Sequence, residues 1–225
     1  MKKGLLVLAS LATMAYEARR YRNNHPSCEK GVEGKKTVVC IGDSITFGSG
    51  VKDNRRKEAW PYALGMLLGD AWQVLNYGVP GAKANATADG AYPKKYLQEA
   101  VNAKADVYCV MLGTNDSKPQ WQDVAGFEEG LRKILSQLPG KIVLMTVPKA
   151  YENEHGVIAY DVDDAFIYRD INPAVRKLAE EFHATLLDVY PYTCGHPEYF
   201  PDGVHPGMEG NMALAWLVHD EIIRL

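Results

Sequence analysis

A serine, a carboxylate and an imidazole stand in short polar strings near opposite ends of the chain. Ser44 follows a Gly-Asp pair directly after an apolar run, and Asp202 precedes His205 by three residues. A serine hydroxyl becomes a good nucleophile when a neighbouring base takes its proton and a third group holds that base in one tautomer. An isolated Asp-x-x-His string is typical of a surface turn. Beside Ser44, the spacing predicts that Asp202 contacts Nδ1–H of His205 while Nε2 faces the serine.

Two further strings offer hydrogen-bond donors of the kind that acyl transfer requires. One runs from Asn76 to Gly81 and contains a second glycine, Gly78, and a glycine lets a backbone N–H approach a substrate oxygen closely. The other runs from Gly113 to Asp116 and presents the side-chain amide of Asn115. Each string alone is typical of a polar turn. Together with the serine and histidine strings, they favour a site that stabilises a developing oxyanion.

Five short apolar runs are expected to be the strands that position these strings. They cover residues 37–41, 72–77, 106–112, 141–147 and 185–189. Helical spacing is expected over residues 60–68, 96–103, 127–138, 173–182 and 208–223. Strands that alternate with helices predict an α/β fold with a parallel sheet covered on both faces. The serine string and both donor strings follow predicted strands, where active sites of open α/β sheets are found.

The composition is that of one globular domain with no marked charge. The 225 residues are 47% hydrophobic and 24% charged, with a net charge of −3, which gives no indication of nucleic acid or an anionic membrane as partner. Residues 36–225 are expected to form the domain and residues 1–35 a leader and linker. The N-terminal lysines and the apolar stretch over 5–15 resemble a signal peptide, ending near residue 15, which predicts a secreted or periplasmic protein. Arginines at 19, 20 and 22 oppose translocation, so a membrane anchor and a cytoplasmic N-terminal helix remain alternatives.

The four cysteines form neither a disulfide framework nor a metal site. Cys40 and Cys109 lie in apolar runs and are expected to be buried free thiols. Cys28 and Cys194 lie in polar stretches and would be able to pair in an exported protein, which the sequence leaves open. No histidine and cysteine spacing is typical of zinc.

Taken together and in this order, the four strings resemble those of the SGNH, or GDSL-type, hydrolase superfamily. The resemblance extends over about residues 38–217. It implies a three-layer, flavodoxin-like sandwich with a five-stranded parallel sheet and no metal or organic cofactor. It also implies that Ser44 is the nucleophile, His205 the base and Asp202 its orienting partner. The oxyanion hole would consist of the N–H groups of Ser44 and Gly78 and the side chain of Asn115.

Two longer stretches, residues 77–82 and 113–121, are similar to the carbohydrate or sialate O-acetylesterase branch of this superfamily. The resemblance implies a serine esterase that removes acetyl groups from a carbohydrate through an acyl-serine intermediate, with a small-molecule or glycan ester as partner. Tyr92, Trp121 and the tyrosines of the long segment over residues 148–170 are candidates to stack on a sugar, with packing of the loops as their alternative role. Asp43 is a candidate substrate contact, although a helix cap is its alternative role.

The segment from residue 148 to 170 has no clear period and is expected to form one wall of the substrate site. A lysophospholipase or thioesterase of the same superfamily is the alternative enzyme, and it would prefer longer acyl chains. A noncatalytic glycan-binding module is the alternative from another class.

Overall fold

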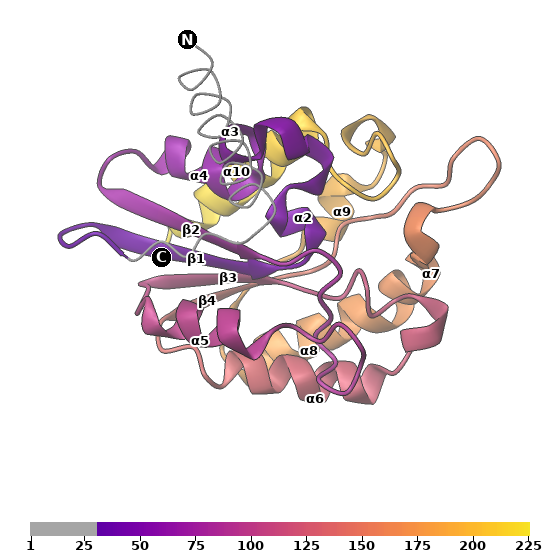
Figure 1. Ribbon diagram of the computed structural model, residues 1–225, viewed down its shortest axis with the longest axis horizontal. Coiled ribbons are helices and arrows are strands. Elements are labelled where there is room, and N and C mark those ends of the chain that lie inside the picture. Colours follow the sequence, from indigo (N-terminus) through magenta and orange to yellow (C-terminus); the bar gives the residue numbers. More distant parts are fainter. Residues whose placement is uncertain (1–30) are drawn as a thin grey trace, which may run out of the picture.

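The computed structural model describes residues 31–225. Its parallel strands form a five-stranded sheet in the order β2-β1-β3-β4-β5 (Figure 1). The strands are β1 (Lys36–Gly42), β2 (Trp72–Gly78), β3 (Val107–Met111), β4 (Lys141–Met145) and β5 (Thr185–Leu187). The α/β fold with a five-stranded parallel sheet that the sequence predicted is therefore confirmed.

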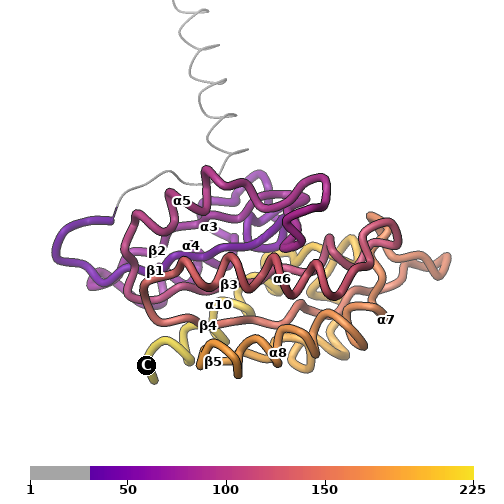
Figure 2. The backbone as a smooth tube through the Cα atoms, turned by 90° about the horizontal axis from the view of Figure 1, so that it is seen from below, coloured from indigo at the N-terminus to yellow at the C-terminus, as the bar shows by residue number. Residues whose placement is uncertain are grey.

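Helices cover both faces of the sheet and give the domain three layers. The longer helices are α4 (Trp60–Leu68), α5 (Lys94–Asn102), α6 (Val124–Leu135), α8 (Asn172–Glu181) and α10 (Met208–Ile222). Figure 1 shows α4 and α10 above the sheet and α5, α6 and α8 below it, and Figure 2 shows these last three side by side. Alternate residues of β1 point to opposite faces of the sheet. Val38 and Cys40 pack with α4 and α10, while Val39 and Ile41 pack with α5, α6 and α8.

The connections contain short helices that were not predicted, because a few residues cannot display a hydrophobic period. They are α2 (Ser44–Phe47), η1 (Ser49–Asn54), α3 (Arg55–Glu58), η2 (Pro119–Trp121), η3 (Ala159–Asp161), α7 (Asp164–Phe166), the π-helical turn η4 (Ile167–Ile171), α9 (Val189–Thr193) and η5 (Pro197–Tyr199). The loop between β4 and α7 extends farthest to the right in Figure 1. The two arms of this loop pair at one isolated antiparallel β-bridge, between Glu152 and Ile158.

Differences at element boundaries have local causes. Helix α6 begins at Val124, earlier than the apolar pattern predicted, because the Asp123 carboxylate accepts a hydrogen bond from the Gly126 N–H at 2.9 Å and caps the helix. Strand β5 is shorter than predicted, since it pairs with β4 only from Thr185 to Leu187.

The predictions for residues 1–30, which include the signal peptide and Cys28, lie outside the described residues. Within residues 31–225, none of the helices combines the length and the apolar character that crossing a bilayer requires. Cys40 and Cys109 are buried free thiols, as expected, and Cys194 is exposed.

Candidate active site

The four polar strings meet at the carboxyl edge of the sheet. Ser44 begins α2 immediately after β1, Gly78 ends β2, and Asn115 follows β3. His205 precedes α10, the last helix of the chain. Because neighbouring parallel strands end at the same edge, segments distant in sequence are brought together there.

Ser44, His205 and Asp202 form a continuous hydrogen-bonded chain. The His205 Nε2 atom lies 2.8 Å from Ser44 Oγ, and His205 Nδ1 lies 2.8 Å from Asp202 Oδ2. The other carboxylate oxygen of Asp202 accepts hydrogen bonds from the N–H groups of Val204 and His205, at 2.9 and 2.6 Å. This arrangement can pass a proton from the serine hydroxyl to the imidazole while the carboxylate fixes the ring.

The electrostatics of Asp202 suit an ionised carboxylate. Partial burial alone would raise the pKa of its carboxyl group, but the hydrogen bonds from His205 and from two backbone N–H groups outweigh burial. Together they hold the pKa of Asp202 well below its usual range. Asp202 is thus a negative charge beside the imidazole and can stabilise the imidazolium that forms when His205 accepts a proton.

The turn between Asp202 and His205 requires the glycine at position 203. Gly203 has a φ of +82°, and a Cβ atom there would lie 2.3 Å from the Tyr151 carbonyl oxygen. The Tyr151 N–H also donates a hydrogen bond to the Gly203 carbonyl at 2.8 Å. The β4–α7 loop therefore packs directly on the backbone that carries Asp202 and His205.

Asp43 caps a helix, and the structure does not support its interpretation as a substrate contact. Its Oδ1 atom accepts a hydrogen bond from the Ile45 N–H at 2.9 Å at the start of α2. The side chain is 1% exposed, and burial raises the pKa of its carboxyl group. Asp43 therefore orients the short helix that presents Ser44.

The structure corrects one member of the expected oxyanion hole. The Gly78 N–H donates to the Oδ1 atom of Asn76 at 2.9 Å, and the position of a Cβ on Gly78 would lie 2.1 Å from the Phe47 nitrogen. Gly78 thus packs closely against the backbone of Phe47, and its N–H is already hydrogen-bonded to Asn76. Gly81, with a φ of +78°, lines the active-site cavity instead, and its N–H has no acceptor among the described residues.

Asn115 is oriented by its neighbour on the β2 side. One of its Nδ2 hydrogens is donated to the Ala82 carbonyl at 3.1 Å, which leaves the second hydrogen available to the cavity that the residue lines. Ser44, Gly81 and Asn115 all line this cavity, so their N–H groups are candidate donors to one substrate oxygen.

Asp116 joins the two donor loops, a role that the sequence did not reveal. Its carboxylate accepts hydrogen bonds from the N–H groups of Ala84 and Asn85, at 3.1 and 2.9 Å. Burial raises the pKa of Asp116 to about 6, against the opposing effect of these donors. Its place directly after Asn115 was the one available signal.

Lowering the pH should raise the free energy of unfolding of the wild type relative to that of a variant with a neutral residue at position 116. An unfolded Asp has a pKa of about 3.9, so between about pH 4 and 6 the folded state binds more protons and the free energy of unfolding falls as pH rises. Denaturant titrations at pH 7 and 4 should show the wild type gaining about 2 kcal/mol relative to Asp116→Asn. Equal pH dependence in the two proteins would contradict this.

The active-site cavity has a volume of about 420 Å³ and is bounded by several loops. Besides the residues above, Lys52, Lys118 and Tyr160 line it. The Tyr160 hydroxyl donates to Asp202 Oδ2 at 3.0 Å, and its ring lies edge-on to His205 with 4.9 Å between ring centroids. Tyr160 belongs to the segment that the sequence predicted as a wall of the site, although nothing singled out this residue.

Of the aromatic residues predicted to stack on a sugar, Tyr160 of the long segment lines this cavity, and Tyr92 and Trp121 do not. Tyr92 is 7% exposed and its hydroxyl donates to the Tyr77 carbonyl at 2.6 Å, so it is a core residue. Trp121 is half-buried, with the Lys83 ammonium 4.7 Å from its ring centroid. Tyr92 therefore has a packing role, and Trp121 makes a cation–π contact with Lys83.

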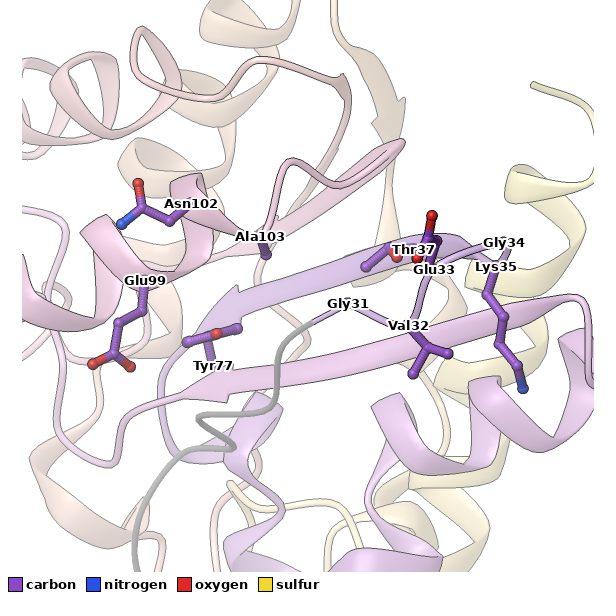
Figure 3. Close-up of a pocket in the computed structure, with 10 residues that line it drawn as sticks. All are labelled: Gly31, Val32, Glu33, Gly34, Lys35, Thr37, Tyr77, Glu99, Asn102 and Ala103. Atoms are coloured by element: carbon purple, nitrogen blue, oxygen red, sulfur yellow. The ribbon is translucent and has the colours of Figure 1, made fainter.

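A larger cavity of about 800 Å³ lies elsewhere (Figure 3). Residues 31–35, Thr37, Tyr77 of β2, and Glu99, Asn102 and Ala103 line it. Its lining contains no histidine, serine or cysteine, so it lacks a serine–histidine or cysteine–histidine pair. Across residues 31–225, no cluster of three or more His, Cys, Asp or Glu side chains has the arrangement of a metal site.

One family model matches most of the chain. The model of the GDSL-like lipase/acylhydrolase family matches residues 40–213. That range covers more than half of the chain and includes Ser44, Gly81, Asn115, Asp202 and His205.

A relative and two solved structures add detail. An acetylxylan esterase from Xylanibacter ruminicola is 28% identical over 206 residues, which cover 80% of this chain but only 42% of that protein. A carbohydrate acetylesterase from Sinorhizobium meliloti superposes with a TM-score of 0.66 at 19% identity, over 84% of this chain and 99% of the other. A lipase/acylhydrolase from Enterococcus faecalis gives a TM-score of 0.69 at 23% identity, over 83% of this chain and 95% of the other. The two structural likenesses show the fold.

Proposed function

The chain belongs to the GDSL-like lipase/acylhydrolase family, and from this premise we propose that it is a serine esterase that removes acetyl groups from a carbohydrate. The observation that carries the proposal is the hydrogen-bonded chain from Ser44 Oγ through His205 to Asp202, with 2.8 Å at each step. It opens into a cavity that also holds three unshared N–H donors.

The reaction proceeds by double displacement. Ser44 Oγ attacks the carbonyl carbon of the ester while its proton moves to His205 Nε2. The tetrahedral intermediate collapses, the bond to the sugar oxygen breaks, and His205 returns the proton to that oxygen. Water then attacks the acetyl-serine with His205 again as base, which releases acetate and restores the Ser44 hydroxyl. The charge of Asp202 stabilises the imidazolium in both halves.

The carbonyl oxygen becomes negatively charged in each tetrahedral intermediate. The N–H groups of Ser44 and Gly81 and the free Nδ2 hydrogen of Asn115 are the donors that would stabilise it. Asp116 supports this hole indirectly, since it holds residues 84 and 85 against the loop that carries Asn115.

The preference for acetate and for a carbohydrate rests on the cavity and on the relatives. A cavity of about 420 Å³ that must also receive the alcohol part of the substrate favours a short acyl group. The relative named an acetylxylan esterase supports an acetylated sugar as substrate. Because this chain spans less than half of that protein's length, the assignment to this chain remains our proposal.

A series of p-nitrophenyl esters from acetate to decanoate, together with acetate release from acetylated xylan, tests the proposal. We expect kcat/KM to be highest for the acetyl ester and acetate to be released from the polysaccharide. A maximum at long acyl chains would favour a lysophospholipase or thioesterase. Absence of turnover on every ester would favour a noncatalytic glycan-binding module.

Tyr160→Phe should lower kcat about five-fold. The hydroxyl that donates to Asp202 Oδ2 is lost while the ring beside His205 is kept, and a hydrogen bond to a charged, partly exposed group contributes on the order of 1 kcal/mol. Steady-state kinetics on p-nitrophenyl acetate measure the effect, with Tyr192→Phe as the matched control because Tyr192 is an exposed tyrosine outside the cavity. A loss confined to KM, or an equal loss in the control, would contradict a role in positioning Asp202.

A further inference from the structure

A cavity distinct from the one in Figure 3 adjoins the active-site cavity across the β4–α7 loop, and we call it the second cavity. Its volume is about 930 Å³. Val162 lines both cavities, while its neighbours divide between them: Tyr160 lines the active-site cavity and Asp161 lines the second. Residues 160–162 are therefore a ridge with Ser44 and His205 on one side and the second cavity on the other.

Tyrosine side chains form an aromatic wall of the second cavity. Tyr168 is 61% exposed, although a large aromatic side chain is usually buried. Its ring lies 5.5 Å from that of Tyr190, at an interplanar angle of 40°, and Tyr151 also lines the cavity. An exposed tyrosine offers an apolar face and a polar edge, which match the C–H face and the hydroxyl groups of a sugar ring.

The polar groups on the floor of this cavity are fixed by one another. The Asp164 carboxylate accepts hydrogen bonds from the Lys149 ammonium at 2.6 Å, the Ala150 N–H at 2.8 Å and the Tyr190 hydroxyl at 3.0 Å. These bonds join the β4–α7 loop to α7 and α9. Tyr190, which the Tyr168 ring contacts, is consequently held in place before any ligand arrives, which lowers the entropic cost of binding.

Two carboxylates of this cavity are available to a ligand. Glu152 and Asp161 line the cavity, and neither side chain has a hydrogen-bond partner among the described residues. Carboxylates accept hydrogen bonds from hydroxyl groups and repel anions. With Asp163 and Asp164 also present and Lys149 the one cation in the lining, the cavity favours a neutral sugar over a uronate or a phosphorylated ligand.

The ridge between the cavities has a strained backbone. Tyr160 and Asp161 adopt φ values of +61° and +58°, in the left-handed region that residues other than glycine rarely enter. Tyr168 lies in the π-helical turn η4, another rare conformation that is frequent at functional sites. Such strain persists only where surrounding contacts enforce it, and here the Tyr160–Asp202 hydrogen bond contributes.

We infer that the second cavity is a subsite for neutral sugar residues of an oligosaccharide whose acetyl ester lies at Ser44. This inference rests on the proposed function and adds to it a substrate longer than one sugar. Residues next to the acetylated one would cross the ridge at Val162 and stack on Tyr168, with Glu152 and Asp161 accepting hydrogen bonds from their hydroxyl groups.

The test compares an acetylated xylotetraose with acetylated xylose. We expect the wild type to have the higher kcat/KM on the tetrasaccharide and Tyr168→Ala to lower the ratio of the two values about five-fold, the size of one good aromatic contact. Tyr168→Phe should keep most of the ratio because the aromatic face remains. Tyr192→Ala is the matched control, since Tyr192 is 58% exposed but lies outside both cavities. A ratio unchanged in Tyr168→Ala, or lowered equally in Tyr192→Ala, would overturn the inference.

Calorimetric titration of Ser44→Ala with unacetylated xylotetraose separates this inference from the proposed function. Saturable binding that an added Tyr168→Ala substitution weakens, together with a wild type that has no esterase activity on any substrate, would uphold the subsite and refute the esterase. Esterase activity without such binding and without a chain-length effect would refute the subsite alone.

Discussion

Replacement of Ser44 by alanine should lower kcat on p-nitrophenyl acetate by about 10⁴- to 10⁶-fold. The substitution removes the oxygen atom that lies 2.8 Å from His205 Nε2 and leaves the imidazole, the carboxylate and the N–H donors in place. Without that oxygen no acyl-enzyme can form, and the remaining rate would come from binding and oxyanion stabilisation alone. Initial-rate kinetics at high enzyme concentration measure the loss.

Ser49→Ala is the control for this prediction, because Ser49 lines the same cavity but takes no part in the hydrogen-bonded chain. It should retain kcat within a few-fold of the wild type. Thermal unfolding should show both variants folded at the assay temperature. Substantial activity in folded Ser44→Ala would show that another residue is the nucleophile.

Replacement of Asn115 by alanine should lower kcat by about 10²- to 10³-fold, with a much smaller change in KM. The amide donates one hydrogen to the Ala82 carbonyl, and its second hydrogen is the side-chain donor to the oxyanion. That donor acts mainly on the charged intermediate, so its loss affects the chemical step more than binding. Steady-state kinetics on the acetyl ester separate the two parameters.

Asn115→Ala also removes a buried hydrogen bond, so a stability control is needed. Asn172 is buried as well and bonds to both backbone groups of Val147, at 2.8 and 3.1 Å, but does not line the cavity. Asn172→Ala should lower the free energy of unfolding while the folded enzyme keeps its kcat. Equal losses of kcat in both variants would mean that Asn115 acts through stability and not through the oxyanion.

The sequence was sufficient to place the fold and the Ser44, His205 and Asp202 group. Apolar runs separated by helical spacing predict a parallel sheet, and the ends of its strands necessarily share one edge. The three-residue spacing of Asp202 and His205 makes their contact a local property of one turn. Predictions that depended on such local or periodic features agree with the structure.

The prediction that the Gly78 N–H belongs to the oxyanion hole was wrong, because the availability of that N–H depends on the direction of the Asn76 side chain. Gly78 and Gly81 belong to the same string, and the N–H of Gly78 is taken by the Oδ1 atom of Asn76. No pattern in the sequence indicates which way the amide of Asn76 points. The free donor at Gly81 therefore became visible only in three dimensions.

Residues in the aperiodic segments were also beyond sequence-based prediction. Tyr160 contacts Asp202 across 42 positions and Asp116 contacts Asn85 across 31, and no local pattern encodes such pairs. Tyr92 and Trp121 are predicted sugar contacts because they lie in stretches similar to the O-acetylesterase branch, but tertiary packing decides whether such a ring faces a ligand or the core. Tyr92 faces the core, while Tyr168 is exposed.

Covalent labelling with diethyl p-nitrophenyl phosphate tests the central claim most directly. The reagent phosphorylates an activated serine, and the product is not hydrolysed as an acetyl-serine would be. We expect esterase activity to be lost in proportion to the incorporation of one diethylphosphoryl group, which peptide mass spectrometry places on Ser44. His205→Ala should react far more slowly, since the base that takes the serine proton is absent. Inactivation without a label on Ser44, or full activity in a protein labelled there, would contradict the account.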